Sequence, residues 1–304
     1  GVGAAITSRV LAEAGFSNVS LVEAQAQPDP DFPTVPFPNP EEAGALDMAI
    51  EQAREQGADL IIAVDPDADR CALAVPDPGA EAGWSPLSGD QIGCLLGEFL
   101  AARGLEGSLA NSIVSSRLLA RIAEAHGLVH HTTLTGFKWI ARAPKLAFGY
   151  EEAIGFCPNP QIARDKDGIA SSVVAASLFA ALKVEGRTAW DELDRLAHVH
   201  GLHVTGPLTF RVEEIEQIAA GMARLRAQPP SVLAGSPVVE VSDLSEGYRG
   251  LPPTDGVLVV TEAGDRVIAR PSGTEPKLKC YLEVILPAPE GEPVPWEAAR
   301  ERLE

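Results

Sequence analysis

The first third of the chain alternates helical and extended patterns of apolar residues. Residues 3–14 and 41–56 repeat apolar side chains at the spacing of a helix. Residues 24–44 contain six prolines, which predict a long irregular connection. The run LIIAV is too short for a helix and is typical of a buried parallel strand. The strands predicted here are 17–23, 60–64 and 71–75, and 76–86 is predicted to be a loop.

The middle of the chain repeats this alternation. Strands are predicted near 109–114, 128–134 and 146–150. The predicted helices lie at 88–104, where Ser88 is a suitable N-cap, and at 117–126, 137–143, 166–186 and 190–200. Strands that alternate with helices in this way are typical of β-α-β units.

The last third has a different pattern. A strand at 208–212 and a helix at 213–227 precede three strands at 238–244, 257–271 and 277–286. The second of these runs is interrupted at 262–265, where Gly264 is typical of a hairpin turn. Closely spaced strands joined by tight turns predict an antiparallel sheet with helices on one face. The fold class is therefore α/β, with two β-α-β domains at 1–86 and 87–203 and a smaller α+β domain at 204–304.

Composition narrows the class of partner. The 304 residues are 45% hydrophobic and 22% charged, which suits a folded globular protein. The net charge of −19 argues against a nucleic-acid partner, and no apolar run is long enough to predict a membrane span. The four cysteines are widely scattered and predict neither a zinc site nor a disulfide framework, so we expect a cytoplasmic protein. We expect a monomer or homodimer with a small-molecule partner.

The strongest local signal is an acidic loop, DPDADR, directly after the strand at 60–64. Asp65, Asp67 and Asp69 alternate along it, so their carboxylates can face the same way. Three carboxylates packed together repel one another unless a cation lies among them. All-oxygen ligands suit Mg²⁺, which keeps open positions for water or phosphate. The loop therefore predicts a magnesium site.

The same loop has three other interpretations. A calcium-binding EF-hand requires Gly and Glu where this chain has Arg70 and Pro76, which excludes it. A phosphatase that forms an aspartyl phosphate would use Asp65 as nucleophile and Asp67 as acid, although such enzymes usually have Thr or Val in place of Asp69. A solvated acidic turn without a ligand is the remaining alternative.

A second polar loop, RPSGTEPK, lies between the last two predicted strands. Its glycine lets backbone N–H groups face one point, and its hydroxyls add further donors. Its arginine offers a planar fork and its lysine a mobile point charge, a combination that suits a phosphate dianion. A polar hairpin with a type I turn is the alternative. The candidate phosphate ligands are Arg270, Ser272, Gly273, Thr274 and Lys277.

Polar side chains also follow the strands of the middle region. Glu151 and Glu152 form a pair of acceptors suited to two vicinal sugar hydroxyls. Arg164 and Lys166 precede the long apolar helix and suit a reacting phosphate. Lys138 lies at the start of another predicted helix, where an anion is favoured.

Two further features have structural explanations. Asp167 suits the N-cap of the long apolar helix. His198, His200 and His203 lie close together in sequence, but histidines at a helix end are commonly structural, so we do not predict a histidine metal site.

Four motifs occur in order: DPDADR, TGFKW, GYEEAIGF with RDKDG, and RPSGTEPK. Together they resemble the α-D-phosphohexomutase family of phosphoglucomutases and phosphomannomutases, and the resemblance extends over essentially the whole chain. The resemblance implies that the aspartates of DPDADR bind Mg²⁺, and that Glu151 and its neighbours contact the sugar. It implies that RPSGTEPK holds the non-reacting phosphate. Arg70 and Lys166 would lie near the transferred phosphate, with Lys166 a candidate for proton transfer.

Two departures from the family pattern stand out. The family commonly has Glu-x-Ser in the sugar loop, whereas the third position here is Ala153. The GYEEAIGF and GFKW loops look more like a subgroup that includes phosphopentomutases. The family nucleophile is a phosphoserine in a Thr-x-Ser-His-Asn-Pro loop, and the 304 residues contain no Ser-His pair. We therefore expect the chain to begin within the second of the family's four domains.

The resemblance implies a specific reaction for the complete protein. A phosphoryl group would move reversibly between the 1- and 6-positions of a hexose phosphate, of glucose or mannose, through phosphoserine and a 1,6-bisphosphate. The implied cofactors are Mg²⁺ and the hexose 1,6-bisphosphate. We expect this chain alone to keep metal and hexose-phosphate binding without turnover. The alternatives are the magnesium-dependent phosphatase and a non-catalytic phosphosugar-binding protein.

Overall fold

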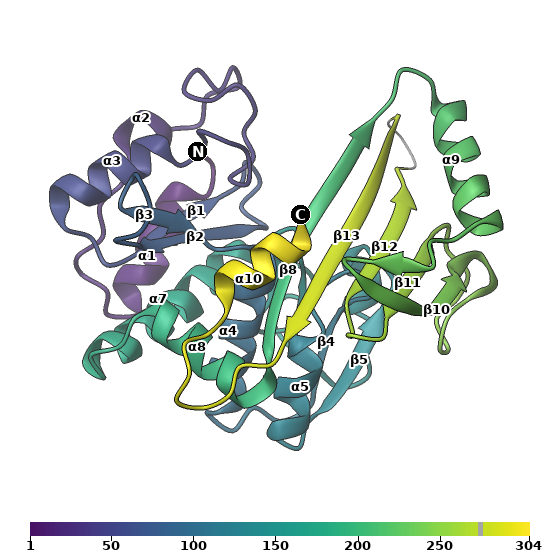
Figure 1. The fold of residues 1–304 in the computed structure, drawn as a ribbon. Coiled ribbons are helices and arrows are strands. Elements are labelled where there is room, and N and C mark those ends of the chain that lie inside the picture. Colours follow the sequence, from purple (N-terminus) through teal and green to yellow (C-terminus); the bar gives the residue numbers. More distant parts are fainter. Residues whose placement is uncertain (273–275) are drawn as a thin grey trace. The chain divides into compact units, whose positions relative to one another are not determined.

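A computed structural model describes residues 1–272 and 276–304 of the chain, drawn in Figure 1. The described residues form two compact units. The first unit, unit 1, contains Gly1–Ser112 and Leu119–Leu193. The second, unit 2, contains Asp194–Glu304 together with the short segment Ile113–Leu118. The second unit therefore recruits residues from the middle of the chain.

Unit 1 begins with a small sheet of order β1-β2-β3. Its strands are β1 (Ile61–Val64), β2 (Cys71–Pro76) and β3 (Trp84–Pro86). The helices α1 (Ala4–Glu13), α2 (Glu23–Ala26) and α3 (Asp47–Gln56) precede this sheet in the chain. Leu46, Ile61, Ala74 and Trp84 form the buried cluster between α3 and the sheet. The strand predicted at 71–75 and the helix predicted at 3–14 are both present.

The pairing of β1 differs from the sequence-based prediction. The run LIIAV was predicted to be a parallel strand, but β1 pairs with β2 in antiparallel register, Ile61 opposite Ala74 and Val64 opposite Cys71. The six-residue connection 65–70 is too short for the crossover of a dozen or more residues that a parallel neighbour needs. Among the described strands β1 pairs only with β2, and its other side lines a cavity of about 740 Å³. That edge is why β1 is only half-buried along most of its length.

Three other local predictions for this region are wrong. Residues 17–23 do not form a strand: side-chain hydrogen bonds to α3 replace backbone pairing, and Gln52 Nε2 donates to the Leu21 carbonyl at 3.0 Å. The helix predicted from residue 41 starts at Asp47, because Gly44 at φ +83° lies in the left-handed region. The loop predicted at 76–86 ends in β3, which pairs with β2.

The remainder of unit 1 is built on a four-stranded sheet of order β5-β4-β6-β7. β4 (Ser108–Ser112) is buried throughout and pairs in parallel with both β5 (Val129–Thr133) and β6 (Leu146–Glu151). The short strand β7 (Gly155–Cys157), which the sequence did not predict, pairs with β6 in antiparallel register. The helices of this part are α4 (Gly89–Ala101), α5 (Leu118–Ala125), α6 (Phe137–Ile140), α7 (Gly168–Val184) and α8 (Ala189–His200), the last of which continues into unit 2.

Two helix starts in this part were predicted correctly. Ser88 forms a capping box on α4, since its side chain accepts from the Gln91 backbone N–H and the Gln91 side chain accepts from that of Ser88. Asp167 Oδ1 accepts from the Ala170 backbone N–H at 2.8 Å and caps α7. These caps fix where both helices begin beside the strand ends.

Unit 2 contains the predicted antiparallel sheet, of order β8-β13-β12-β11-β10-β9 (Figure 1). Its strands are β8 (Leu202–Arg211), β9 (Val232–Leu233), β10 (Ser236–Asp243), β11 (Val257–Thr261), β12 (Arg266–Pro271) and β13 (Lys277–Leu286). The helix α9 (Ile215–Ala227) covers one face through Ile218 and Met222, and a short 3₁₀ helix occupies Leu244–Glu246. Gly264, at φ +91°, forms the predicted turn between β11 and β12. The helix α10 (Trp296–Leu303) was not predicted.

A buried carboxylate ties the recruited segment to this sheet. Glu283 in β13 accepts hydrogen bonds from Ser116 Oγ at 3.0 Å and from Arg117 Nε at 2.6 Å. It also lies 3.1 Å from the Arg266 guanidinium and 3.2 Å from His203 Nδ1. Burial alone would raise the pKa of Glu283, but the charges and hydrogen bonds of these neighbours outweigh it and hold that pKa well below its ordinary value.

Among residues 1–272 and 276–304, no single helix is long and apolar enough to span a membrane. One pair of helices, α7 and α8, has sufficient length and apolar composition only when the two are taken together, and they are bent by 89°.

Candidate magnesium and phosphosugar site

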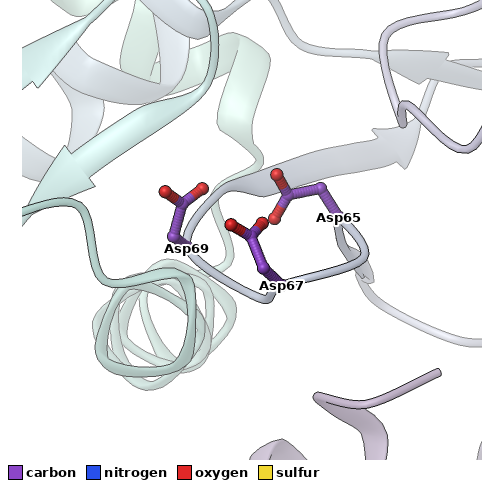
Figure 2. Close-up of side chains that lie close together, drawn as sticks. All are labelled: Asp65, Asp67 and Asp69. Carbon is purple, nitrogen blue, oxygen red and sulfur yellow. The ribbon is translucent and has the colours of Figure 1, made fainter.

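The DPDADR loop gathers its three carboxylates at the end of β1. Carboxylate oxygens of Asp65, Asp67 and Asp69 all lie within 4.8 Å of one another. Figure 2 shows the three side chains on the turn that follows the strand. The Asp65 and Asp69 side chains are half-buried, and Asp67 is exposed. An oxygen cluster of this size, open to solvent on one side, has the ligand chemistry of a Mg²⁺ site.

Close backbone packing shapes this loop. The turn is closed by a hydrogen bond from the Ala68 N–H to the Asp65 carbonyl at 3.0 Å, and Ala68 has φ +59°. A Cβ added at Gly3 would lie 2.6 Å from the Ala68 Cβ, and one added at Gly168 would lie 2.3 Å from the Arg70 carbonyl oxygen. Glycines at the starts of α1 and α7 therefore allow both helices to press against the loop.

The electrostatics of the cluster are unbalanced. Burial raises the pKa of Asp65. A hydrogen bond of 2.9 Å from the Arg70 backbone N–H to Asp65 Oδ1 partly offsets this effect, and the charges of Asp69 and Asp67 raise the pKa further. A carboxylate whose charged form is disfavoured by its neighbours is stabilised when a cation binds among them. The residues present therefore fit a divalent cation.

One cation from another element faces the loop. Lys166 Nζ lies 2.9 Å from Asp69 Oδ2 and 5.7 Å from the centre of the Phe137 ring. Burial alone would lower the pKa of Lys166, but the hydrogen bond to Asp69 and the charges of Asp69 and Glu151 outweigh it and raise the pKa. Lys166 is thus charged, and it links the RDKDG loop to the DPDADR loop.

The sugar-loop candidate Glu151 reaches the same region. Its carboxylate and the Lys166 chain both lie beside Gly155: a Cβ there would be 2.5 Å from Lys166 Cδ and 3.0 Å from Glu151 Oε1. Burial, followed by the charge of Glu152, raises the pKa of Glu151 to about 7. The structure thus brings Glu151, Lys166 and the aspartate loop together within unit 1.

The turn after Glu151 is strained and tied to the aspartate loop. Ile154 is fully buried and has φ +51°, a conformation that a β-branched residue adopts only when its surroundings enforce it. The Cys71 N–H donates to the Ile154 carbonyl at 3.0 Å, and Arg70 forms a β-bridge with Gly155. Arg70 Nε is buried and has no hydrogen-bond partner among the described residues, so it is a candidate donor to a ligand.

The phosphate-loop candidates lie at the end of the β12–β13 hairpin in unit 2. Arg270 belongs to β12 and Lys277 to β13, and the Ser272 N–H donates to the Lys277 carbonyl at 2.9 Å. Arg270 Nε is buried without a hydrogen-bond partner among the described residues. The predicted ligands Gly273 and Thr274 lie outside the described residues.

The remaining candidates are not brought to this cluster. Lys138 is exposed in α6, and Arg164 is exposed in the loop before α7. No contact described for residues 1–272 and 276–304 joins either side chain to the aspartates. Glu152 has a different partner from Glu151, since its Oε2 accepts a hydrogen bond from Ser112 Oγ at 3.0 Å.

Comparison with known proteins places these loops in a family. Sequence models of phosphoglucomutase/phosphomannomutase match in three consecutive parts: alpha/beta/alpha domain II at residues 1–79, alpha/beta/alpha domain III at 88–198 and the C-terminal domain at 181–292. The chain belongs to the phosphoglucomutase/phosphomannomutase family. The family resemblance inferred from the motifs is confirmed, and so is the α/β fold class with its antiparallel C-terminal sheet.

Individual relatives agree with this assignment. A protein of Haemophilus influenzae named "Probable phosphomannomutase" is 45% identical over 93% of this chain and 58% of its own length. A phosphoglucomutase of Staphylococcus haemolyticus is 36% identical over 93% of this chain and 56% of its own length. The solved structure of a phosphoglucomutase/phosphomannomutase family protein from Burkholderia thailandensis has the same fold, with a TM-score of 0.69 at 18% identity over 99% of this chain and 56% of that one. The chain thus spans little more than half the length of the curated relatives it matches.

Three residues that shape this site, Ser112, Tyr150 and Gly155, were not predicted as site residues. Tyr150 and Gly155 lie within the GYEEAIGF motif, near Glu151 in sequence, whereas Ser112 reaches the site only because separate strands meet there. Gly155 is detectable in principle, since a glycine within a strand is a common sign of close backbone approach. Ser112 has no local signature, because its role depends on the pairing of β4 with β6.

Proposed function

We propose that this chain carries the metal, sugar and distal-phosphate loops of a phosphohexomutase. The reaction is the reversible transfer of a phosphoryl group between the 1- and 6-positions of a hexose phosphate, of glucose or mannose. It runs through a phosphoserine and a hexose 1,6-bisphosphate. The relatives' names, phosphomannomutase and phosphoglucomutase, support this class of isomerase in carbohydrate metabolism.

One observation carries the proposal. Three aspartates converge within 4.8 Å, and Lys166 pairs with one of them at 2.9 Å beside Glu151. Phosphoryl transfer depends chiefly on positioning and on neutralising negative charge, and a site with both a divalent-cation cluster and a charged lysine supplies this.

The proposed roles follow from the chemistry of each side chain. Asp65, Asp67 and Asp69 hold Mg²⁺, which when bound neutralises charge on the transferred phosphoryl group. Lys166 and Arg70 bind the oxygens of that group. Glu151 accepts hydrogen bonds from sugar hydroxyls.

The RPSGTEPK loop is proposed to hold the phosphate that does not react. Arg270, Ser272 and Lys277 lie at its base, and Arg270 Nε is buried without a partner among the described residues. Gly273 and Thr274 are proposed to complete the loop. Lys138 and Arg164 remain candidate substrate contacts. The chain has no Ser-His pair for the nucleophile loop, so we expect it to bind hexose phosphate without turnover.

Calorimetry tests this proposal directly. The 304-residue chain is titrated with α-D-glucose 1-phosphate and with α-D-mannose 1-phosphate in the presence of Mg²⁺. Replacing Arg270 with Ala removes a charge-assisted contact, which we expect to weaken binding by about 1.5–3 kcal/mol. Asp65→Asn tests the metal cluster, and Arg9→Ala, which removes an exposed guanidinium from α1, is the matched control.

The outcomes separate the alternatives. Unchanged affinity in Arg270→Ala would exclude the phosphate-loop assignment. Release of inorganic phosphate by the chain alone, abolished by Asp65→Asn, would favour the aspartyl-phosphate phosphatase instead. Comparing the two sugar phosphates also shows whether Ala153, in place of the serine that the family commonly has, alters the choice of hexose.

A further inference from the structure

The residues on both sides of Glu151 are held by other elements. The Tyr150 hydroxyl donates a hydrogen bond to Asp90 Oδ1 at 2.8 Å, and Tyr150 is fully buried. On the other side, Glu152 Oε2 accepts from Ser112 Oγ at 3.0 Å. Glu151 ends β6 and Glu152 begins the turn that follows, so these contacts hold the backbone on both sides of Glu151.

The backbone of α4 contacts both flanking residues. A Cβ added at Gly89 would lie 1.9 Å from the Glu152 carbonyl oxygen, and one added at Gly93 would lie 2.5 Å from the Tyr150 ring. Asp90, between these glycines, accepts the Tyr150 hydrogen bond. The start of α4 therefore packs against the turn with no intervening side chain.

The end of β4 contacts the same two flanking residues, Tyr150 and Glu152. Asn111 lies opposite Tyr150 in the strand register and hydrogen-bonds its hydroxyl, and the next residue, Ser112, bonds Glu152. Asn111 Oδ1 lies 3.0 Å from His130 Nε2. Burial lowers the pKa of His130 to about 4, so the neutral ring donates from Nε2 at neutral pH. The hydrogen bonds run in one direction, from His130 through Asn111 and Tyr150 to Asp90.

We infer that Tyr150 and Glu152 are positioning residues, which fix Glu151 toward Lys166 and the aspartate loop. Glu152 is contacted by Gly89 of α4 and by Ser112 of β4. Tyr150 is contacted by the next residue of α4, Asp90, and by the preceding residue of β4, Asn111. The strained conformation of Ile154 is consistent with a turn whose geometry is fixed from several sides. What Glu151 binds rests on the proposed function, but its fixed orientation does not.

This inference changes the role of Glu152. The sequence pattern suggested two glutamates acting as a pair of sugar acceptors. In the structure Glu152 is bound to Ser112, whereas Glu151 lies beside Gly155 and Lys166. Glu152 therefore affects sugar binding indirectly, because it helps to fix the orientation of Glu151.

The first test measures binding of α-D-glucose 1-phosphate and of inorganic phosphate to the full chain with Mg²⁺. Tyr150→Phe removes the hydrogen bonds of the hydroxyl with Asp90 and Asn111, which we expect to weaken glucose 1-phosphate binding roughly fivefold and leave inorganic phosphate unchanged. Glu152→Ala should weaken sugar binding, and Glu152→Gln, which keeps an acceptor for Ser112, should restore it. Tyr248→Phe is the matched control, because it removes a tyrosine hydroxyl bonded to Glu240 at 2.9 Å in unit 2.

A second measurement needs no ligand. The carboxyl group of Glu151 is titrated by NMR in the wild-type chain and in Tyr150→Phe. If the contacts of Tyr150 fix the Glu151 side chain, removing them lets the carboxylate reach water. The pKa of Glu151 then falls from about 7 toward its ordinary value.

The outcomes of the two measurements are separable. An unchanged Glu151 titration in Tyr150→Phe would overturn the positioning role, and so would an equal loss of affinity for sugar phosphate and inorganic phosphate. Failure of the wild-type chain to bind glucose 1-phosphate would overturn the proposed function alone, and the titration would then decide the positioning role.

Discussion

Two groups of carboxylates in this protein have opposite charge balance. In unit 2, Glu283 is completely buried and is paired with Arg117, Arg266 and His203. In unit 1, three aspartates crowd together beside a single lysine partner, Lys166, among the described contacts. The pKa of Glu283 is held well below its ordinary value, whereas that of Asp65 is raised.

The difference distinguishes a structural carboxylate from a candidate binding site. A buried carboxylate with all of its partners in the protein has nothing further to bind, so it holds Ile113–Leu118 against the sheet of unit 2. An unbalanced, partly exposed cluster is stabilised when a cation binds to it from solution. Counting the cations that face each acid is therefore more informative than counting the acids.

The largest expected effect comes from breaking the balanced cluster. Glu283→Gln leaves the buried guanidinium of Arg266 and the half-buried one of Arg117 without their carboxylate, and we expect it to cost about 3–5 kcal/mol of unfolding free energy. Urea denaturation of the full chain measures this cost. Glu124→Gln is the control, since that residue forms an exposed ion pair with Arg121, and its removal should cost under about 1 kcal/mol. Equal losses in the two variants would contradict the comparison.

The next effect concerns the unbalanced cluster and its metal. Mg²⁺ at a hundred times its dissociation constant should add about 2.7 kcal/mol of stability, because it binds only the folded loop. Thermal melts with MgCl₂ and with EDTA check this, and Asp67→Asn should remove most of the difference. Glu55→Gln, on the exposed side of α3, should retain it. A melting temperature that Mg²⁺ does not change in the wild-type chain would reject the site.

A third effect is a pH dependence caused by Glu151. The pKa of this half-buried carboxyl is raised to about 7, so between pH 4.5 and 7 the folded state binds more protons than the unfolded state. Stability therefore falls as pH rises through this window, by about 1–3 kcal/mol. Glu151→Gln should flatten that slope, as measured by urea denaturation at pH 5 and pH 8. A slope that persists in the variant would assign the dependence to another group.

The smallest expected effect is a change in stability in the absence of metal. In EDTA, Asp67→Asn removes one like charge from the cluster and should stabilise the chain by a few tenths of a kcal/mol. The same variant should lose stability relative to the wild type once Mg²⁺ is added. Differential scanning calorimetry in both buffers tests this reversal of sign. Destabilisation in both buffers would mean that Asp67 has a structural role in the loop.

The sequence by itself determined the loops and most of the elements around them. Short-range signals were sufficient there: LIIAV forms a strand, Ser88 and Asp167 cap their helices, and Gly264 forms the hairpin turn. The order of the four motifs also identified the family. These features depend on neighbours within a few residues, so a local pattern encodes them.

Tertiary structure decided what the local pattern does not contain. Residues 17–23 have a strand-like composition but form no strand, because a strand exists only where another backbone pairs with it. Ser112 and Asp90 reach the residues beside Glu151 only because β4 pairs with β6 and α4 packs on their ends. Whether an acid is structural or available to bind depends on which cations the fold brings to face it. For Glu283 those partners come from residues far away in sequence, and no sequence window includes them.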